Sequence, residues 1–313
     1  MFKNVKKRFL LLIYTLTLNP ALDYTVCTEK LVNGAESFSL GCGGKGINVS
    51  VMLKNLGIKS AALGFTAGFT GAEFERLVID TGIISDFIIL EDGLTRINIK
   101  IRDKTETDIN VCGPCVPSEK LKKLYEKLEK LKAGDWLVIS GSIAGGLPNN
   151  IYAEISEFAG RKGARVIIDA AGNVLTDSLY TKPFLIKPNR EELSEIFGKE
   201  IKYINDVFAC AEKLKETGAQ NVMVTLGKEG TAFLSTNGER LYCNAANGKA
   251  TDTVGAGDSA VAGFIAGYIK HGDLKEALKL SAAAGGATAF SNGIGSAELV
   301  SKLLNEINVV LFG

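Results

Sequence analysis

The chain of 313 residues is poor in histidine, tryptophan and net charge. Its single histidine, His271, lies in Lys270-His271-Gly272-Asp273, a pattern typical of a helix C-terminus followed by a turn. One histidine gives little support for a histidine-based triad or a histidine-rich metal site. The 36 basic and 35 acidic residues leave a net charge of +1, which argues against nucleic-acid binding through bulk charge. Any anion site must therefore be local.

Long hydrophobic runs are also missing. The basic residues between Lys3 and Arg8 precede an apolar run, as in a signal peptide, but this run continues into residues 14–18, which alternate like a strand. No small-residue cleavage site follows. We interpret Leu11 to Leu18 as a first buried strand behind a short basic leader. No later stretch is long and apolar enough to span a bilayer, so the sequence predicts a cytoplasmic protein with no membrane partner.

The six cysteines include one pair in a thiol-redox pattern, Cys112-Gly113-Pro114-Cys115. The segment before it lacks the tryptophan usual in redox modules, and Pro117 follows almost at once. Two cysteines are too few for a structural zinc site without other ligands. We interpret the motif as a Gly-Pro turn that leads into a helix. The remaining cysteines, Cys27, Cys42, Cys210 and Cys243, are expected to be thiols in a reducing compartment.

From residue 118 onward, hydrophobic periodicity alternates between the helical and the strand type. It predicts helices over 118–131, 150–161, 190–197, 206–217, 258–270 and 274–289, and strands over 136–140, 165–169, 184–187, 221–226 and 231–235. Such alternation is typical of an α/β fold with a mostly parallel central sheet and helices on both faces. In sheets of this kind the ligand lies beyond the carboxyl ends of the strands.

The first third of the chain predicts helices over 48–56 and 74–81 and a strand over 60–65. Four further segments, 24–32, 36–40, 96–101 and 106–111, alternate like half-exposed strands and are expected to form a small separate sheet. The sequence has no internal repeat, low-complexity segment or linker. We therefore predict one domain over 1–313, with a small sheet contributed by about 24–42 and 95–112.

The most informative motif is Gly255-Ala256-Gly257-Asp258 at the start of an apolar helix. A glycine-rich turn that runs into a helix presents free backbone N–H groups and the positive end of the helix dipole, which together suit a phosphate. An aspartate at this place is reasonable if it takes a proton from an alcohol that attacks the phosphate. The motif alone also fits a capped loop without a ligand. With its surroundings, it predicts phosphoryl transfer to a hydroxyl.

Other polar residues fall at the ends of predicted strands or next to glycines. Each group has an ordinary structural explanation: a helix-entry loop around Gly43 and Gly44, a solvated strand face at Arg96 and Lys100, and a capping box at Asn189. Their number at the strand ends favours a site. The set is Asp23, Lys45, Asn48, Arg96, Asn98, Lys100, Ser140, Ser142, Lys187, Asn189, Glu192, Thr225, Gly227 and Gly230.

These motifs, in this order, resemble the phosphofructokinase B (ribokinase-like) family of sugar kinases from about Tyr14 to Asn292. The motifs are Thr17-Leu18-Asn19-Pro20-Ala21-Leu22-Asp23, Gly43-Gly44-Lys45-Gly46-Ile47-Asn48-Val49, Thr95-Arg96-Ile97-Asn98-Ile99-Lys100, Ser140-Gly141-Ser142, Lys187-Pro188-Asn189-Arg190-Glu191-Glu192-Leu193, Thr225-Leu226-Gly227 and Val254-Gly255-Ala256-Gly257-Asp258-Ser259. The resemblance implies a ribokinase-like three-layer αβα fold. It also implies a small β-sheet lid that covers the sugar and joins two copies in a homodimer.

Within the family, the Asn19-Pro20 start and the strings at 95–100 and 107–110 look like the branch that acts on phosphorylated ketohexoses. The resemblance then implies conversion of fructose 1-phosphate to fructose 1,6-bisphosphate with ATP and Mg²⁺. Tagatose 6-phosphate is the alternative substrate. A non-catalytic sugar-phosphate sensor is the alternative from another class of function, and the intact Gly-Ala-Gly-Asp motif argues against it.

The resemblance also implies a role for each matched residue. Asp258 is expected to be the base, and the N–H groups around Gly255, Ala256 and Gly257 to hold the charge on the transferred group. The residues expected to bind the sugar are Asp23, Gly43, Gly44, Asn48, Asn98 and Ser142, with Lys45 and Arg96 on its phosphate. Those expected on the ATP side are Lys187, Asn189, Glu192, Thr225, Gly227, Gly230 and Asn292, with Ala284 and Ala287 near the adenine. Asn189 and Glu192 are expected to hold Mg²⁺ through water.

The sequence departs from the family pattern at three places. Ile143-Ala144-Gly145-Gly146 separates Ser142 from Leu147-Pro148, Ala67 stands where a glycine is usual, and Ala171 stands where a hydroxyl residue is common. These departures affect the loop geometry that we expect, and not the reaction class.

Overall fold

The computed structural model describes residues 11–27, 37–102 and 106–313, without the side chains of Arg102 and Glu106. The predicted basic leader and parts of the predicted strand 24–32 lie outside the described residues. Within the described ranges, no helix is both long enough and apolar enough to cross a bilayer. The predicted helix end at His271 is confirmed, because His271 is the last residue of its helix and Gly272 follows in the left-handed conformation, with φ 68°.

Eleven strands of the described chain form one large sheet in the order β15-β14-β13-β12-β11-β10-β9-β1-β4-β5, with β6 also paired to β4. The parallel strands are β1 (Ile13–Thr17), β4 (Ala61–Ala67), β5 (Ile84–Ser85), β6 (Ile88–Leu90), β9 (Trp136–Ser140), β10 (Arg165–Asp169), β11 (Leu185–Ile186) and β12 (Asn221–Thr225). This confirms the predicted parallel sheet. The antiparallel strands β13 (Thr231–Leu234), β14 (Arg240–Cys243) and β15 (Val309–Leu311) extend it at one edge.

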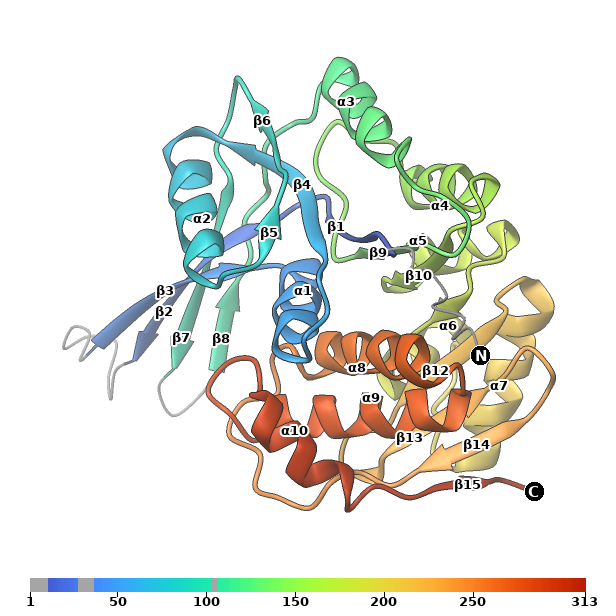
Figure 1. Ribbon diagram of the computed structural model, residues 1–313. Coiled ribbons are helices and arrows are strands. Elements are labelled where there is room, and N and C mark those ends of the chain that lie inside the picture. The colour runs from blue at the N-terminus through green and yellow to red at the C-terminus, as the bar shows by residue number, and fades with distance from the viewer. Residues whose placement is uncertain (1–10, 28–36, 103–105) are drawn as a thin grey trace, which may run out of the picture.

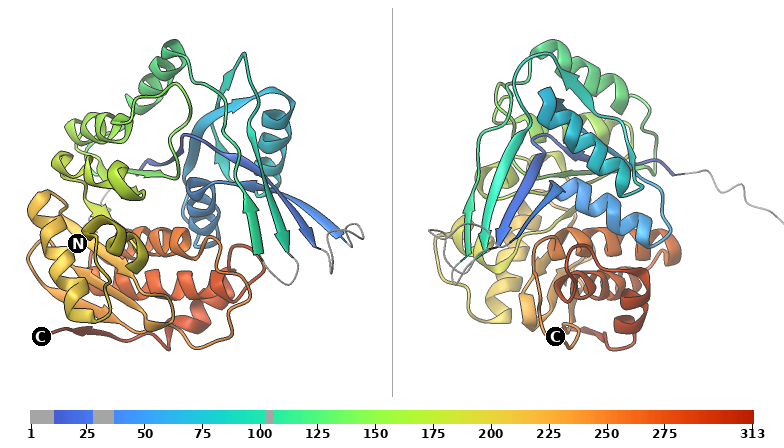
Figure 2. Two further views of the ribbon diagram at one scale, coloured as in Figure 1. Left: turned by 180° about the vertical axis from the view of Figure 1, so that it is seen from behind. Right: turned by 90° about the vertical axis from the view of Figure 1, so that its left-hand side faces the viewer.

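Helices cover both faces of this sheet and make three layers (Figures 1 and 2). One face carries α1 (Lys45–Asn55), α8 (Ala256–His271), α9 (Leu274–Ala289) and α10 (Ala297–Leu304). The other carries α3 (Ser118–Leu128), α4 (Ile151–Arg161), α5 (Gly172–Thr176), α6 (Arg190–Phe197) and α7 (Ile204–Thr217). Buried strand residues alternate between the two cores: in β9, Trp136 and Val138 join the first, whereas Leu137 and Ile139 join the second.

A second sheet of four strands projects from the main body and is called the lid here (Figure 1). Its order is β3-β2-β7-β8, with β2 (Ala21–Cys27), β3 (Ser37–Gly43), β7 (Arg96–Arg102) and β8 (Glu106–Ile109). This confirms the predicted small sheet. Helix α2 (Gly68–Asp80) covers its base, where Phe74 and Val78 pack with Leu22.

The two faces of the lid differ because side chains alternate along each strand. Asp23 pairs in register with Asn98, so these polar residues share one face. Tyr24 pairs with Leu40 on one side and with Ile99 on the other, and Ile99 pairs with Ile109. The lid therefore has a polar face and an apolar face, and Phe38 on the apolar face is 68% exposed.

Candidate active site

Two cavities meet at the carboxyl ends of the parallel strands. The larger cavity, of about 990 Å³, lies between the lid, α1 and the start of α8, and it includes Thr17, Asp23, Lys45, Asn48, Arg96, Ser142, Lys187, Glu192, Gly255 and Asp258 in its lining. The smaller cavity, of about 480 Å³, is lined by Thr225, Gly227, Gly230, Ala256, Ala282, Gly285, Gly286 and Phe290 among others. Asn189, Thr225 and Gly257 line both, so the two cavities share a wall.

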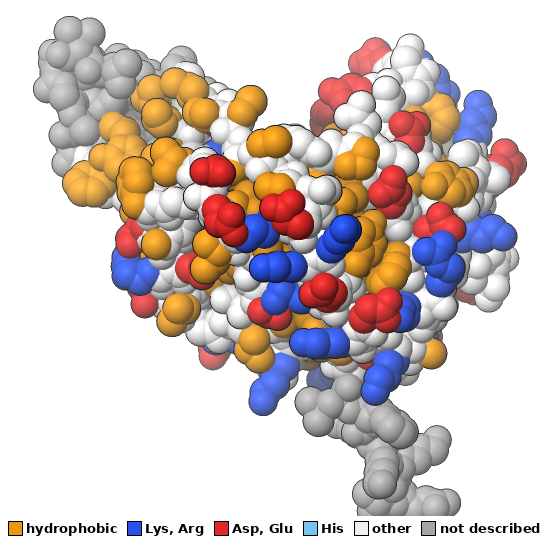
Figure 3. Space-filling model, turned by 90° about the horizontal axis from the view of Figure 1, so that it is seen from above, with side chains coloured by type: hydrophobic (Ala, Val, Ile, Leu, Met, Phe, Trp, Pro, Cys, Tyr) orange, Lys and Arg blue, Asp and Glu red, His pale blue; other side chains and the backbone are white. Residues whose placement is uncertain are grey.

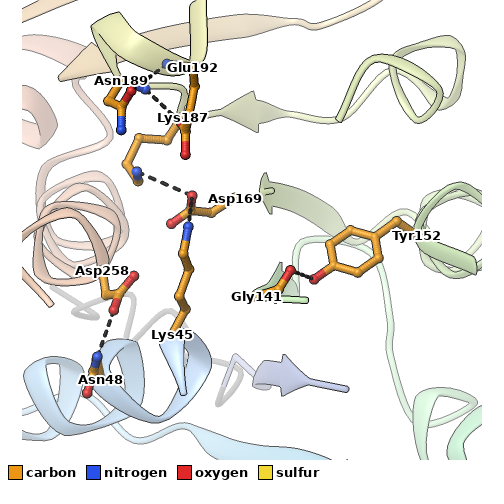
Figure 4. Close-up of polar contacts among 9 residues, drawn as sticks. All are labelled: Lys45, Asn48, Gly141, Tyr152, Asp169, Lys187, Asn189, Glu192 and Asp258. Carbon is orange, nitrogen blue, oxygen red and sulfur yellow. Dashed lines mark hydrogen bonds and ion pairs between the residues drawn. The ribbon is translucent and has the colours of Figure 1, made fainter. Parts of the chain in front are cut away.

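Asp258 lies in the first turn of α8, next to Gly257 of the shared wall; it lines the larger cavity, and its exposed fraction is 5%. Its Oδ2 accepts a hydrogen bond of 2.7 Å from the Asn48 side-chain amide of α1 (Figure 4). Burial, together with the negative charge of Asp169, raises the pKa of Asp258 to about 6, whereas the Asn48 hydrogen bond acts in the opposite direction. A carboxylate with this pKa is still ionised at neutral pH and is a stronger base than an exposed aspartate.

The start of α8 offers free backbone donors beside this carboxylate. Gly255 is the N-cap and takes φ +81°, a left-handed conformation that favours glycine. The Ala256 N–H is already used, since it donates to the Thr253 carbonyl at 3.2 Å. Within the described part of the chain, no acceptor is found for the N–H groups of Gly257 and Asp258. The N–H of Gly255 likewise has no acceptor in this part of the chain, so two of the three predicted donors, those of Gly255 and Gly257, are available together with that of Asp258.

Asp169 is a buried residue of this site that the sequence did not predict. It is the last residue of β10 and is 1% exposed. Its Oδ1 accepts from Lys45 Nζ at 3.0 Å and from Lys187 Nζ at 3.3 Å. Burial alone would raise the pKa of Asp169, but the ammonium groups of Lys187 and Lys45 outweigh burial and hold this pKa below its ordinary value. The sequence feature that could have identified Asp169 as a site residue is its position at the end of a buried parallel strand.

Lys45 lines the larger cavity, and its ammonium group lies beside Asp169 (Figure 4). Burial would lower its pKa, but the charges of Asp169 and Asp258 outweigh burial and raise it, so Lys45 is a firm cation. We expected Lys45 to lie with Arg96 on the substrate phosphate. In the structure Lys45 bonds Asp169, whereas Arg96 Nε donates to the Asn19 carbonyl at 3.2 Å, although both cations line the larger cavity.

The polar face of the lid holds Asp23 over the larger cavity. Its Oδ1 accepts from the Asn98 amide at 3.0 Å and its Oδ2 from Lys100 Nζ at 2.7 Å. A Cβ atom on Gly43 would lie 2.6 Å from this carboxylate, so only glycine allows the close approach. Gly44, next to it, lines the larger cavity. Asn98 is not among the lining residues, and its contact in the structure is with Asp23.

Asn19 connects three segments around Arg96. Its carbonyl accepts from Arg96, and its side-chain amide donates to Ser142 Oγ at 3.2 Å. Arg96 is half-buried, and burial lowers the pKa of its guanidinium. The positive charge of an arginine that is half-buried in a cavity wall favours binding of an anion. Asn19 was part of the quoted Asn-Pro motif but was not predicted as a site residue.

The residues expected on the ATP side are partly brought together. Asn189 and Glu192 form the capping box of α6: Glu192 N donates to Asn189 Oδ1 at 2.7 Å, and Asn189 N donates to Glu192 Oε2 at 2.9 Å. The predicted capping box at Asn189 is therefore confirmed, and both residues also line the larger cavity. Asn292 is exposed and is not among the lining residues, while Ala284 and Ala287 are buried in the core.

The thiol pattern lies where the lid rejoins the main body. Cys112 and Cys115 are exposed, and all six cysteines are free. Cys115 forms a parallel bridge with Gly145, and Val116 N donates to the Gly145 carbonyl at 2.8 Å. The segment Ile143-Ala144-Gly145-Gly146, a departure from the family pattern, thus supports this turn. Among the described residues, no group of three or more His, Cys, Asp or Glu side chains is arranged to hold a metal ion.

Comparison with known proteins gives one consistent result. Residues 12–299 match the model of the pfkB family carbohydrate kinases. The chain is 41% identical to the 1-phosphofructokinase of Bacillus subtilis over 95% of this chain and 99% of that protein. It is 36% identical to the D-tagatose-1-phosphate kinase of Bacillus licheniformis, over 95% and 99% of the two chains.

Solved structures agree with the fold. The crystal structure of phosphofructokinase-2 from Escherichia coli in complex with substrates and products matches with a TM-score of 0.86 and 27% identity, over 94% of this chain and 98% of that chain. Ribokinase from Arabidopsis thaliana, complexed with ribose and ATP, matches with a TM-score of 0.79 and 19% identity, over 95% and 99%. The ribokinase-like fold is therefore confirmed.

Proposed function

Since the chain belongs to the pfkB family of carbohydrate kinases, we propose that it is a 1-phosphofructokinase, which uses ATP to convert fructose 1-phosphate to fructose 1,6-bisphosphate. The observation that carries this proposal is the placement of Asp258. Its buried carboxylate lines a charged cavity at the start of α8, next to Gly257, which this cavity shares with a second cavity lined by small residues. A sugar phosphate fits the first cavity and a nucleotide the second.

This geometry supports the following reaction. The Asp258 carboxylate takes the proton of the 6-hydroxyl group of the sugar while the hydroxyl oxygen forms a bond to the γ-phosphorus of ATP. The bond between that phosphorus and the β,γ-bridging oxygen breaks, and ADP leaves with the electron pair. The free N–H groups of Gly257 and Asp258 stabilise the charge on the transferred phosphoryl group. Asn48 holds the carboxylate in place through its hydrogen bond.

The cations of the larger cavity divide into two groups in this proposal. Arg96, on the lid side, binds the 1-phosphate of the sugar, because a guanidinium can contact a phosphate in a bidentate way. Lys45 and Lys187 lie at Asp169, close to the shared wall, and we assign them to the transferred phosphoryl group. Asp23, held by Asn98 and Lys100, accepts hydrogen bonds from sugar hydroxyls.

The residues near the shared wall fit a magnesium ion that is held mainly by phosphates and water. The capping box uses one oxygen of the Glu192 carboxylate, and the other projects toward Lys187 and Asp169 (Figure 4). Glu192 and Asn189 supply oxygen ligands of the hard type that Mg²⁺ prefers, but too few for a complete site. We propose that both contact the ion through water. Bound Mg²⁺ would neutralise charge on the β- and γ-phosphates.

A substrate panel tests the proposed specificity. We expect the highest kcat/KM with ATP and fructose 1-phosphate, compared with tagatose 1-phosphate, tagatose 6-phosphate and fructose 6-phosphate. Tagatose 1-phosphate belongs in the panel because two relatives are named D-tagatose-1-phosphate kinase. A higher kcat/KM with either tagatose phosphate would overturn the substrate assignment. Binding of fructose 1-phosphate without any ATP consumption would instead support the alternative of a non-catalytic sensor.

The apolar face of the lid supports a homodimer. Outside the part covered by α2, this face carries Phe38, Leu40 and Ile109, which are 68%, 37% and 46% exposed. Tyr24 stacks on Phe38 with ring centroids 5.6 Å apart. Hydrophobic side chains gather on the arm of the molecule that bears the lid tip (Figure 3). We propose that two chains bury these faces against each other, because exposed apolar patches of this kind mark interaction sites.

Measurement of the molar mass in solution tests the dimer. The unchanged protein should sediment as a dimer, and Phe38→Asp should shift it toward the monomer, because the change places a charge in the apolar face. Phe69→Asp is a matched control, since Phe69 is also highly exposed but lies at the start of α2. A monomeric unchanged protein would contradict the proposal.

The six free cysteines are consistent with the proposed cytoplasmic location.

A further inference from the structure

Asp169 is a buried charge that the proposed reaction leaves without a function. Its Oδ1 holds two ammonium groups from different elements, Lys45 at the start of α1 and Lys187 after β11. Its Oδ2 is buried, and no partner for it exists among the described residues. Burying such a charge is costly unless it is paired, so the arrangement of one carboxylate oxygen with two lysines needs an explanation.

The four charged groups lie around one point (Figure 4). Asp258 is faced from α1 by Asn48 and Lys45, from β10 by Asp169, and from the segment after β11 by Lys187. The backbone of Gly257 is also close, because a Cβ atom there would lie 3.1 Å from Lys187 Nζ. Two carboxylates and two ammonium groups balance each other in this buried space before any ligand binds.

Lys45 and Lys187 lie near two carboxylates, Asp169 and Asp258. The carboxylate with which they pair determines how strong a base Asp258 is. An ammonium group that paired directly with Asp258 would favour its charged form and make it a weaker base. In the structure both lysines pair with Asp169 instead, at 3.0 and 3.3 Å. The charge of Asp169 raises the pKa of Asp258 by more than either lysine lowers it. Asp169 thus keeps two cations beside the base without allowing them to neutralise it.

We propose that Asp169 is a positioning residue, which holds the Lys45 and Lys187 ammonium groups at the transfer point and keeps Asp258 a competent base. This inference rests on the proposed function, because it assigns the effect to phosphoryl transfer. Asp169 itself touches neither the acceptor hydroxyl nor the transferred group. Its influence passes through the two lysines and through its charge.

The Asp169→Asn variant tests the proposal because it keeps the shape and removes the charge. Loss of this charge lowers the pKa of Asp258, because the negative charge of Asp169 raises it by more than either lysine lowers it. The acid limb of the pH profile of kcat/KM should therefore move to lower pH, since the base stays ionised further into acid. Above the limb, kcat should fall by about 10²-fold, because the lysines stay near Asp258 but are no longer held in a fixed position at the transfer point. The Asp135→Asn variant is the control: Asp135 is also buried and accepts from Leu12 N and Lys132 N, but it lies outside both cavities.

A direct titration separates this inference from the proposed function. Carboxyl carbon NMR of aspartate-labelled, ligand-free protein reports the pKa of Asp258, with the signal assigned by its loss in Asp258→Asn. We expect a lower pKa in Asp169→Asn and an unchanged one in Asp135→Asn, whatever substrate the enzyme uses. An unchanged or higher pKa would overturn the inference, even if the protein phosphorylates fructose 1-phosphate.

A second variant applies if Asp169→Asn does not fold. Lys45 is 37% exposed at its side chain, so Lys45→Met leaves no buried hole. It removes a cation that lowers the pKa of Asp258 and frees the charge of Asp169, so the NMR titration should move to higher pH. A titration of Asp258 that does not respond to Lys45→Met would contradict the proposed coupling.

Discussion

The two cavities that meet beside Asp258 differ in the chemistry of their lining. The larger cavity has Asp23, Lys45, Arg96, Lys187, Glu192 and Asp258 in its wall. Three of these charges pair with residues outside the lining, Asp23 with Lys100 and the two lysines with Asp169. The smaller cavity is lined mainly by glycine and alanine, and two of its rim charges, Arg190 and Glu229, pair at 2.6 Å. We therefore propose that the first cavity selects its ligand by charge and hydrogen bonding, and the second by shape. Single charges should matter in the first cavity, and volume should matter in the second.

The largest expected effect is at the wall that the cavities share. Asp258→Asn keeps the size of the side chain and removes the proton acceptor, so kcat should fall by ~10²–10⁴-fold. The KM values for ATP and fructose 1-phosphate should change little, because neither cavity is altered in shape. Steady-state kinetics measure both. Asp273→Asn, at the N-cap of α9 where asparagine also caps, is the matched control and should keep full turnover. Near-normal turnover of Asp258→Asn would refute the role of the base.

A smaller effect is expected from a single charge of the larger cavity. Arg96→Ala should raise the KM for fructose 1-phosphate by roughly 10–100-fold, because a hydrogen bond to a charged group contributes about 1.5–3 kcal/mol. The KM for ATP should not change, since Arg96 lies outside the smaller cavity. Lys228→Ala, at the rim of the smaller cavity, is the control for loss of a positive charge. If the KM for the sugar phosphate stays the same in Arg96→Ala, its phosphate binds elsewhere.

The smallest effect is expected from a change of volume in the smaller cavity. Ala282→Phe places a ring in the space that we assign to the nucleotide, and overpacking costs of about 1 kcal/mol correspond to a fivefold rise in the KM for ATP. The KM for fructose 1-phosphate should be unchanged. Steady-state kinetics of this variant give the KM for ATP and the KM for fructose 1-phosphate. A rise in the KM for fructose 1-phosphate alone would reverse the assignment of the two cavities.

The fold was predictable where the hydrophobic period was strong. Strands 136–140 and 165–169 have the predicted bounds because each is a nearly fully buried apolar run. Helices 190–197 and 274–289 have them because several helical turns leave a clear period. The elements β5, β6, α5 and β15 were not predicted, since strands of two or three residues and a helix of little more than one turn carry no measurable period. The antiparallel edge of the sheet was also missed, because the direction of a strand depends on its partner and not on its own residues.

In the candidate site, only residues that belong to recognisable sequence motifs were predictable. Asp258, Asn48 and the Asn189–Glu192 box were identified because each sits beside a glycine turn or a helix start. Asp169 was not, since a carboxylate at a strand end gives no sign of the two lysines that reach it from other segments. The separation of Lys45 from Arg96 likewise depends on which neighbour each cation finds in space.

The borders of the large sheet are very short, with three residues in β15 and two in β5. A strand of that length presents few unsatisfied main-chain groups to a passing chain, so it makes a poor template for intermolecular pairing. Aggregation at high concentration should therefore start from monomers whose apolar lid face, with Phe38 and Leu40, is uncovered, and not from the sheet border.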